Sequence, residues 1–248
     1  MFETDLHSHT LFSPCGVHTV LEMLHAAKDR GLKGLAITDH GSFVGGTANS
    51  VFFERLSQPV PGIRLYKGVE ANVMDRNGRI DVNPRYLQWT DIVLLGYHHF
   101  PEKDLDPREY SDIMISTLEC NPCVDVVTHP NMPDYPMDFR SLAREARRLG
   151  VALELNNSKV ALGRASEDAT RRLVEICAEE EAPVVVNSDA HTVEEPGETR
   201  AIRAVMEEVG FPPDLVINRT LESTESWIRQ RRPGKLIPFN ALGCTRKI

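Results

Sequence analysis

Histidine and carboxylate residues recur along this chain at spacings that suit metal binding. The first set is Asp5-Leu6-His7-Ser8-His9-Thr10, in which His7 and His9 are two residues apart. On a β-strand, side chains at i and i+2 project from the same face, so these two imidazoles can chelate one ion. The same kind of residue follows later apolar runs, and the series continues with His40, Glu70, His98, His129, Asp189 and His191.

This donor set predicts more than one metal ion. Imidazole nitrogen predominates and carboxylate oxygen is the minority, which favours Zn²⁺, Mn²⁺ or Fe²⁺ over Ca²⁺ or Mg²⁺. The eight candidates exceed the four ligands of a tetrahedral zinc site, so two or three ions are expected. Glu70 has two oxygens and lies in the middle of the series, so it is the expected bridging ligand. Asp189-x-His191 mirrors His7-x-His9 at the other end of the chain.

The elements that carry these residues alternate between short apolar strands and amphipathic helices. After the opening strand we expect strands at 35–40, 63–69, 92–97, 124–128, 151–155 and 184–186, with a short late strand at 215–218 and a hairpin turn at Asn77-Gly78. Helices are expected at 19–30, 47–57, 107–118, 139–149, after the capping residue Ser166, at 198–209 and at 221–230, before an irregular tail at 233–248. This order predicts parallel strands closed into a barrel, in which strand ends meet at one mouth.

Length and composition favour an ordered enzyme-sized domain. The 248 residues, 41% of them hydrophobic, are expected to form one domain over residues 1–248. The net charge of −8 argues against binding long nucleic acids, and the arginines at 144, 147 and 148 are interpreted as the solvated face of a helix. No signal-peptide pattern, membrane span or disulfide framework is visible among the five scattered cysteines, so we expect a cytoplasmic protein without membrane contacts. The oligomeric state stays open.

Taken in order, these motifs resemble a known family. The segments D-L-H-S-H-T, I-T-D-H-G, G-V-E-A-N, G-Y-H, T-H-P, L-E-L-N-N-S and N-S-D-A-H are similar to the PHP (polymerase and histidinol phosphatase) family, and most of all to its YcdX-like phosphatase branch. The resemblance implies a distorted (β/α)7 TIM-like barrel, a trinuclear metal centre and phosphoesterase activity. By matching position it assigns the ligands to His7, His9, His40, Glu70, His98, His129, Asp189 and His191.

The chain departs from the branch pattern at Cys15, where a further histidine is expected. A thiolate is a good zinc ligand, so we include Cys15 in the ligand set. Two alternatives stay open: His18 reaches in from the same loop, or the third ion is weak or absent. Arg164 matches an arginine of the related pattern and is interpreted as a phosphate ligand, with a plain surface role as the alternative. Asp39 is expected to support a histidine.

The resulting hypothesis is a phosphatase acting on a small phosphorylated substrate. Metal ions, two or three of them and most simply Zn²⁺, would lower the pKa of a water, and the hydroxide would attack phosphorus in line. Glu70, Asp189, His191 and Arg164 are the predicted catalytic residues. Alternatives are a phosphodiesterase or nuclease acting on short nucleotides, a histidinol phosphatase, and a metal-binding module without catalysis.

Overall fold

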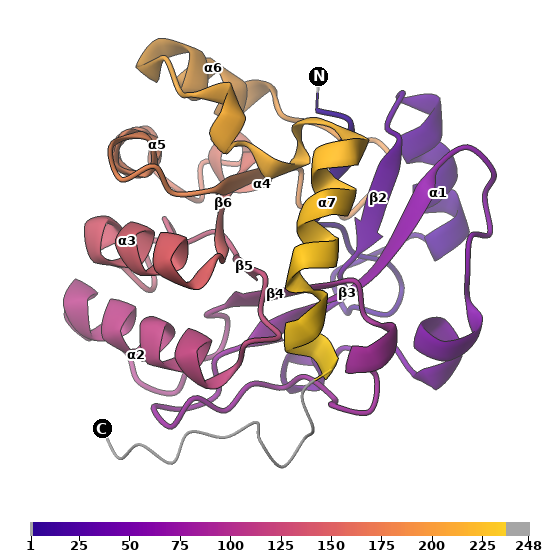
Figure 1. Ribbon diagram of the computed structural model, residues 1–248, viewed down its shortest axis with the longest axis horizontal. Helices are drawn as coiled ribbons and strands as arrows, with labels where there is room; N and C mark the ends of the chain where they lie inside the picture. The colour runs from indigo at the N-terminus through magenta and orange to yellow at the C-terminus, as the bar shows by residue number, and fades with distance from the viewer. Residues whose placement is uncertain (1, 237–248) are drawn as a thin grey trace.

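Seven parallel strands form a nearly closed barrel in the computed structural model, which describes residues 2–236 (Figure 1). The strands follow one another around the sheet in chain order: β1 Thr4–Asp5, β2 Gly34–Ile37, β3 Arg64–Asn72, β4 Ile92–Gly96, β5 Val126–Val127, β6 Ala152–Asn156 and β7 Val184–Asn187. A parallel bridge between Ser8 and Ala190, just beyond β1 and β7, joins the first strand to the last. The predicted distorted (β/α)7 barrel is therefore confirmed.

Helices connect the strands and begin at residues that suit helix starts. They are α1 Val20–Asp29, α2 Pro107–Cys120, α3 Phe139–Leu149, α4 Asn157–Ala161, α5 Glu167–Glu179, α6 Arg200–Val209 and α7 Leu221–Arg231. Thr19 forms a capping box with Glu22 at the start of α1, and Asp106 caps α2, whose first residue is proline. These caps satisfy amide groups that would otherwise lack partners at helix starts.

The barrel interior is filled by apolar side chains and closed at its base by α7. Leu6, Tyr66, Leu94 and Val185 are buried there together with Ile228 of α7. In Figure 1, α7 runs across the strands at the viewer's side. The polar residues that follow the strands lie at the opposite end of the barrel, where the strands terminate.

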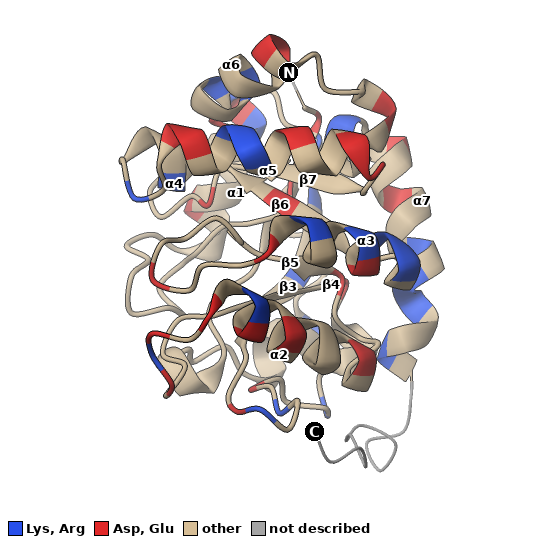
Figure 2. Ribbon diagram, turned by 90° about the vertical axis from the view of Figure 1, so that its left-hand side faces the viewer, with Lys and Arg blue, Asp and Glu red and all other residues tan. Residues whose placement is uncertain are grey.

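The outer helices carry charges of both signs, as Figure 2 shows on α2, α3 and α5. Arg144 pairs with Glu180 at 2.9 Å, Arg147 with Glu181 at 2.6 Å, and Arg148 with Glu119 and Glu145. The basic cluster of α3 is thus exposed and balanced by neighbouring carboxylates, as expected of a solvated helix face.

Some predicted elements differ from those observed. The helix expected at 47–57 is only a π-turn, Val51–Arg55, whose two phenylalanines provide its buried contacts. The late strand expected at 215–218 is reduced to one parallel bridge, between Val216 and Val184 of β7, flanked by the 3₁₀ turns Pro213–Leu215 and Ile217–Arg219. The Asn218 side chain forms hydrogen bonds with the backbone of Val186 and Thr4 in place of further strand pairing.

The hairpin around Asn77-Gly78 holds one antiparallel bridge, between Val73 and Ile80. The start of the expected irregular tail is a 3₁₀ helix, Arg232–Leu236, and the remainder of that tail lies outside the described residues. Short helix α4 had no sequence prediction. Between residues 2 and 236, no helix has the length and apolar character needed to traverse a bilayer.

Candidate metal centre

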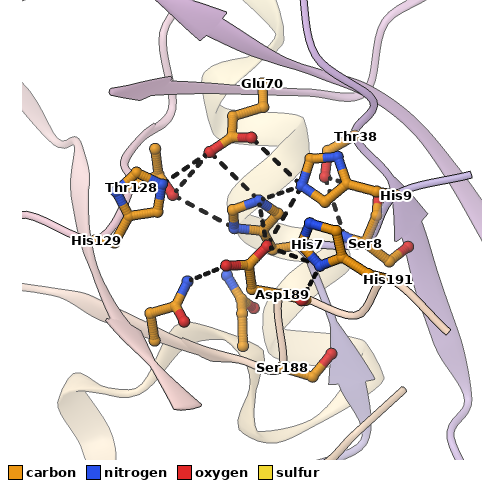
Figure 3. Close-up of polar contacts among 12 residues, drawn as sticks. His7, Ser8, His9, Thr38, Glu70, Thr128, His129, Ser188, Asp189 and His191 are labelled. Atoms are coloured by element: carbon orange, nitrogen blue, oxygen red, sulfur yellow. Dashed lines mark hydrogen bonds and ion pairs between the residues drawn. The ribbon is translucent and has the colours of Figure 1, made fainter. Parts of the chain in front are cut away.

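The predicted ligands converge at the carboxyl-terminal mouth of the barrel. They lie on or just after five neighbouring strands and β7: His7 and His9 follow β1, His40 follows β2, Glu70 lies on β3, His98 follows β4, His129 follows β5, and Asp189 and His191 follow β7. Figure 3 shows Glu70 and Asp189 facing each other with His7 between them. The parallel topology, with each strand end at the same edge, explains how residues from both ends of the chain meet.

Glu70 lies at the middle of this cluster and is buried. One of its oxygens, Oε1, lies 3.0 Å from His129 Nε2 and 3.1 Å from His98 Nε2. The other, Oε2, lies 2.9 Å from His40 Nδ1 and 3.3 Å from His9 Nε2. Oε1 also lies 3.4 Å from His7 Nε2, so each oxygen faces a different set of imidazoles, which suits a carboxylate that bridges two ions.

Asp189 occupies the opposite side of the cluster. Its Oδ1 lies 3.3 Å from Nε2 of both His7 and His9. Its Oδ2 accepts a hydrogen bond from Asn156 Nδ2 at 3.1 Å and pairs with Nζ of Lys159. The two oxygens therefore have separate partners, and only Oδ1 is directed at the histidines.

The donor atoms form three overlapping groups, each with the residues needed to hold a metal ion. These groups are His7, His9 and Asp189; His40, Glu70 and His98; and His9, Cys15 and His40, with donor atoms in each lying within 4.8 Å of one another. Burial lowers the pKa of His9 to about 3, so its imidazole stays neutral, which is the form that binds metals. The chemistry and spacing of the donors suit two or three ions of the zinc type.

Cys15 lies at the third of these groups, on the loop that follows β1. Burial tends to raise the pKa of its thiol, but hydrogen bonds with His191 and His40 outweigh it and lower the pKa to about 6. The alternative donor, His18, belongs to none of the three groups, and its Nδ1 is buried without a hydrogen-bond partner among residues 2–236. The geometry therefore favours Cys15 over His18.

A buried carboxylate that the sequence reasoning missed orients His7. Glu154 on β6 is fully buried, and its Oε1 accepts from His7 Nδ1 at 2.7 Å and from Asn187 Nδ2 at 2.8 Å. Its Oε2 accepts from Thr128 Oγ1 at 2.6 Å and from the His129 amide at 2.9 Å. A proton held on Nδ1 of His7 leaves Nε2 as the free donor atom toward the centre.

A second chain of hydrogen bonds orients His98. Its Nδ1 lies 2.6 Å from Asn72 Oδ1, and Nδ2 of the Asn72 side chain donates to Asp81 Oδ2 at 2.9 Å. Asn72 lies two residues after Glu70 on β3, so both face the same side of the strand. Asp39 has a different role from the expected one: it accepts from the backbone and hydroxyl of Thr10, both at 2.7 Å, and so fixes the loop after His9.

The cation in the centre is Lys159 rather than Arg164. Lys159 is 8% exposed and lies on α4, a short helix that turns its ammonium group back toward Asp189. Arg164 lies on the exposed turn after α4, and its side chain forms neither an ion pair nor a hydrogen bond with the described residues. Glu154 and Asn72 could have been found from the sequence, because each lies two positions from another polar residue on a buried strand. Lys159 shows no such pattern.

Comparisons with known proteins agree with this geometry. The PHP domain model matches residues 5–158. A protein of Acetivibrio thermocellus named a probable phosphatase is 32% identical over 234 residues, covering 93% of this chain and 97% of the relative. One of Syntrophotalea carbinolica with the same name is 34% identical over 227 residues, covering 90% and 94%.

Solved structures share the fold at low sequence identity. A histidinol phosphate phosphatase from Lactococcus lactis, determined with zinc, L-histidinol and phosphate, aligns with a TM-score of 0.62 at 15% identity, covering 85% of this chain and 94% of that one. A chain from a study of metal-dependent tyrosine phosphatases of Bacillus subtilis and Streptococcus pneumoniae aligns with a TM-score of 0.57 at 18% identity, covering 95% of this chain and 96% of that one.

Proposed function

Because the chain belongs to the PHP family, we propose that it is a phosphomonoesterase whose centre holds two or three zinc ions. Family membership and the phosphatase relatives make it a metal-dependent phosphoric ester hydrolase. The observation that carries the proposal is the position of Glu70, whose two oxygens each face a separate pair of histidines within 3.3 Å. Mn²⁺ and Fe²⁺ are the other ions compatible with these donors.

The proposed ligands are His7, His9, Cys15, His40, Glu70, His98, His129, Asp189 and His191. Bound metal ions supply an acidified water as nucleophile and neutralise charge on the phosphoryl group. The chain's own contribution is to fix donor atoms: Glu154 holds the proton of His7 on Nδ1, and Lys159 with Asn156 holds Oδ2 of Asp189.

Lys159 is proposed as the positive side chain nearest the phosphoryl group. Its ammonium is already inside the cluster, beside Asp189, whereas the guanidinium of Arg164 lies in solvent. A buried ammonium in a site that excludes water interacts more strongly with phosphate than an exposed one. His191, 27% exposed, and His98, 17% exposed, lie on the side from which solvent and substrate reach the centre.

The test is turnover of 4-nitrophenyl phosphate and of bis(4-nitrophenyl) phosphate by protein loaded with Zn²⁺ or Mn²⁺. We expect metal-dependent turnover with preference for the monoester. Faster turnover of the bis ester would make the protein a phosphodiesterase instead. Turnover of neither ester, with the metal bound as measured by elemental analysis, would reject a phosphatase built on this centre.

A further inference from the structure

Exposed apolar side chains lie on two loops at the carboxyl ends of strands, the end of the barrel that carries the metal centre. The two loops that follow β1 and β2 carry Leu11, Val17, Phe43 and Val51, which are 59%, 60%, 41% and 56% exposed. We call these four residues the apolar rim. They are four of the seven large hydrophobic side chains that are exposed in residues 2–236.

The stretches of these loops that hold the apolar rim carry no charged side chain, although the Asp81 carboxylate contacts one of them and accepts from the Phe43 amide at 3.0 Å. Segments 10–18 and 41–53 contain no lysine, arginine, aspartate or glutamate. By contrast, the helices on the outside of the barrel carry both signs of charge (Figure 2). An uncharged, apolar surface beside a cluster of metal ligands is suited to the part of a ligand that carries no charge.

Hydrogen bonds join the two loops to each other and to the centre. The Thr47 amide donates to the Phe12 carbonyl at 2.7 Å, which ties the second loop to the first. The Val17 amide donates to the His191 carbonyl at 3.4 Å. Cys15 lies between Leu11 and Val17 in the sequence, and its Sγ lies within 4.8 Å of ligand atoms of His9 and His40. The apolar rim therefore borders the Cys15 side of the proposed ligand set.

We propose that the apolar rim binds the alcohol part of the substrate, which is therefore a phosphate monoester of an apolar alcohol. The inference rests on the proposed function. A phosphoryl group held at the centre must direct its ester oxygen away from the buried ligands, toward the solvent-exposed side. There the alcohol meets the apolar rim, and burial of its carbon atoms against Leu11, Val17 and Phe43 strengthens binding.

The test is the ratio of kcat/KM for hexyl phosphate to that for ethyl phosphate. Both esters release a primary alcohol of nearly equal acidity, so the ratio isolates contact with the chain. Full burial of one methylene is worth about fourfold in binding, and half-burial about twofold, so four methylenes raise the ratio to roughly 16. Phe43→Ser combined with Leu11→Ser should lower it to about 4, and the control Leu236→Ser, at the exposed base of the barrel, should leave it unchanged.

Outcomes that contradict the inference differ from outcomes that contradict the proposed function. A wild-type ratio near 1, with clear turnover of both esters, would overturn the inference and leave the proposed function intact. An unchanged ratio in the double variant would also overturn it. If light scattering shows a dimer that Phe43→Ser dissociates while the ratio stays unchanged, the apolar rim is a contact between two copies of the chain instead. Absence of turnover with every ester would reject the proposed function itself.

Discussion

Replacement of Glu154 by glutamine should weaken metal binding without touching a metal ligand. Glu154 lies behind His7 and accepts hydrogen bonds on both oxygens, from His7 Nδ1 and Asn187 on Oε1 and from Thr128 and the His129 amide on Oε2. Glutamine keeps one oxygen, which can serve the Oε2 side. Its amide group then faces His7 Nδ1 as a donor.

This change reverses the tautomer of His7. With Nδ1 accepting from glutamine, the ring proton moves to Nε2, the atom that lies 3.3 Å from Asp189 Oδ1 and 3.4 Å from Glu70 Oε1. A metal ion must displace that proton before it can bind. Loss of a hydrogen bond behind a metal ligand typically weakens affinity about 10- to 100-fold, or about 1.4 to 2.8 kcal/mol.

The assay is competition for Zn²⁺ between the protein and a chelator of known affinity, with folding followed by circular dichroism. Loss of one or two buried hydrogen bonds should also lower stability by about 2 to 3 kcal/mol, and hence Tm by roughly 5 to 10 °C. Glu222→Gln, on the exposed first turn of α7, is the matched control and should change neither quantity. Zinc affinity within twofold of wild type in folded Glu154→Gln would refute the tautomer argument.

Four further outcomes are expected. Cys15→Ala should bind one metal ion fewer per chain by elemental analysis, and an unchanged count would remove Cys15 from the ligand set. Lys159→Met should raise KM for 4-nitrophenyl phosphate at least tenfold while Lys159→Arg recovers part of the loss; equal effects of the two variants would contradict a role for the positive charge. Arg164→Ala should change kcat/KM less than about threefold, because the side chain is exposed, and a larger loss would restore its predicted catalytic role. Zn²⁺ at 100 times its Kd should stabilise the folded protein by about 2.7 kcal/mol for each ion bound in thermal unfolding, and no shift in Tm would show that the centre does not bind it.

Much of the centre was predictable from the sequence, because side chains two residues apart share one face of a strand and parallel strands end at the same edge. His7 and His9, and likewise Asp189 and His191, needed only the two-residue period of a strand, and the barrel topology brought them together. Glu154 was visible in the L-E-L-N-N motif but received no role, since a carboxylate within an apolar strand does not reveal which side chain it contacts. Lys159 was beyond prediction because α4 is a single short turn without hydrophobic periodicity.

The closure of the barrel between its first and last strands also limits when the centre can exist. His7 and His9 follow β1, whereas Asp189, which completes their group, follows β7. During translation, His7 and His9 are synthesised long before Asp189. The three-residue group therefore cannot form until residue 189 has left the ribosome and the segment around Ala190 lies beside Ser8, as it does in the folded protein.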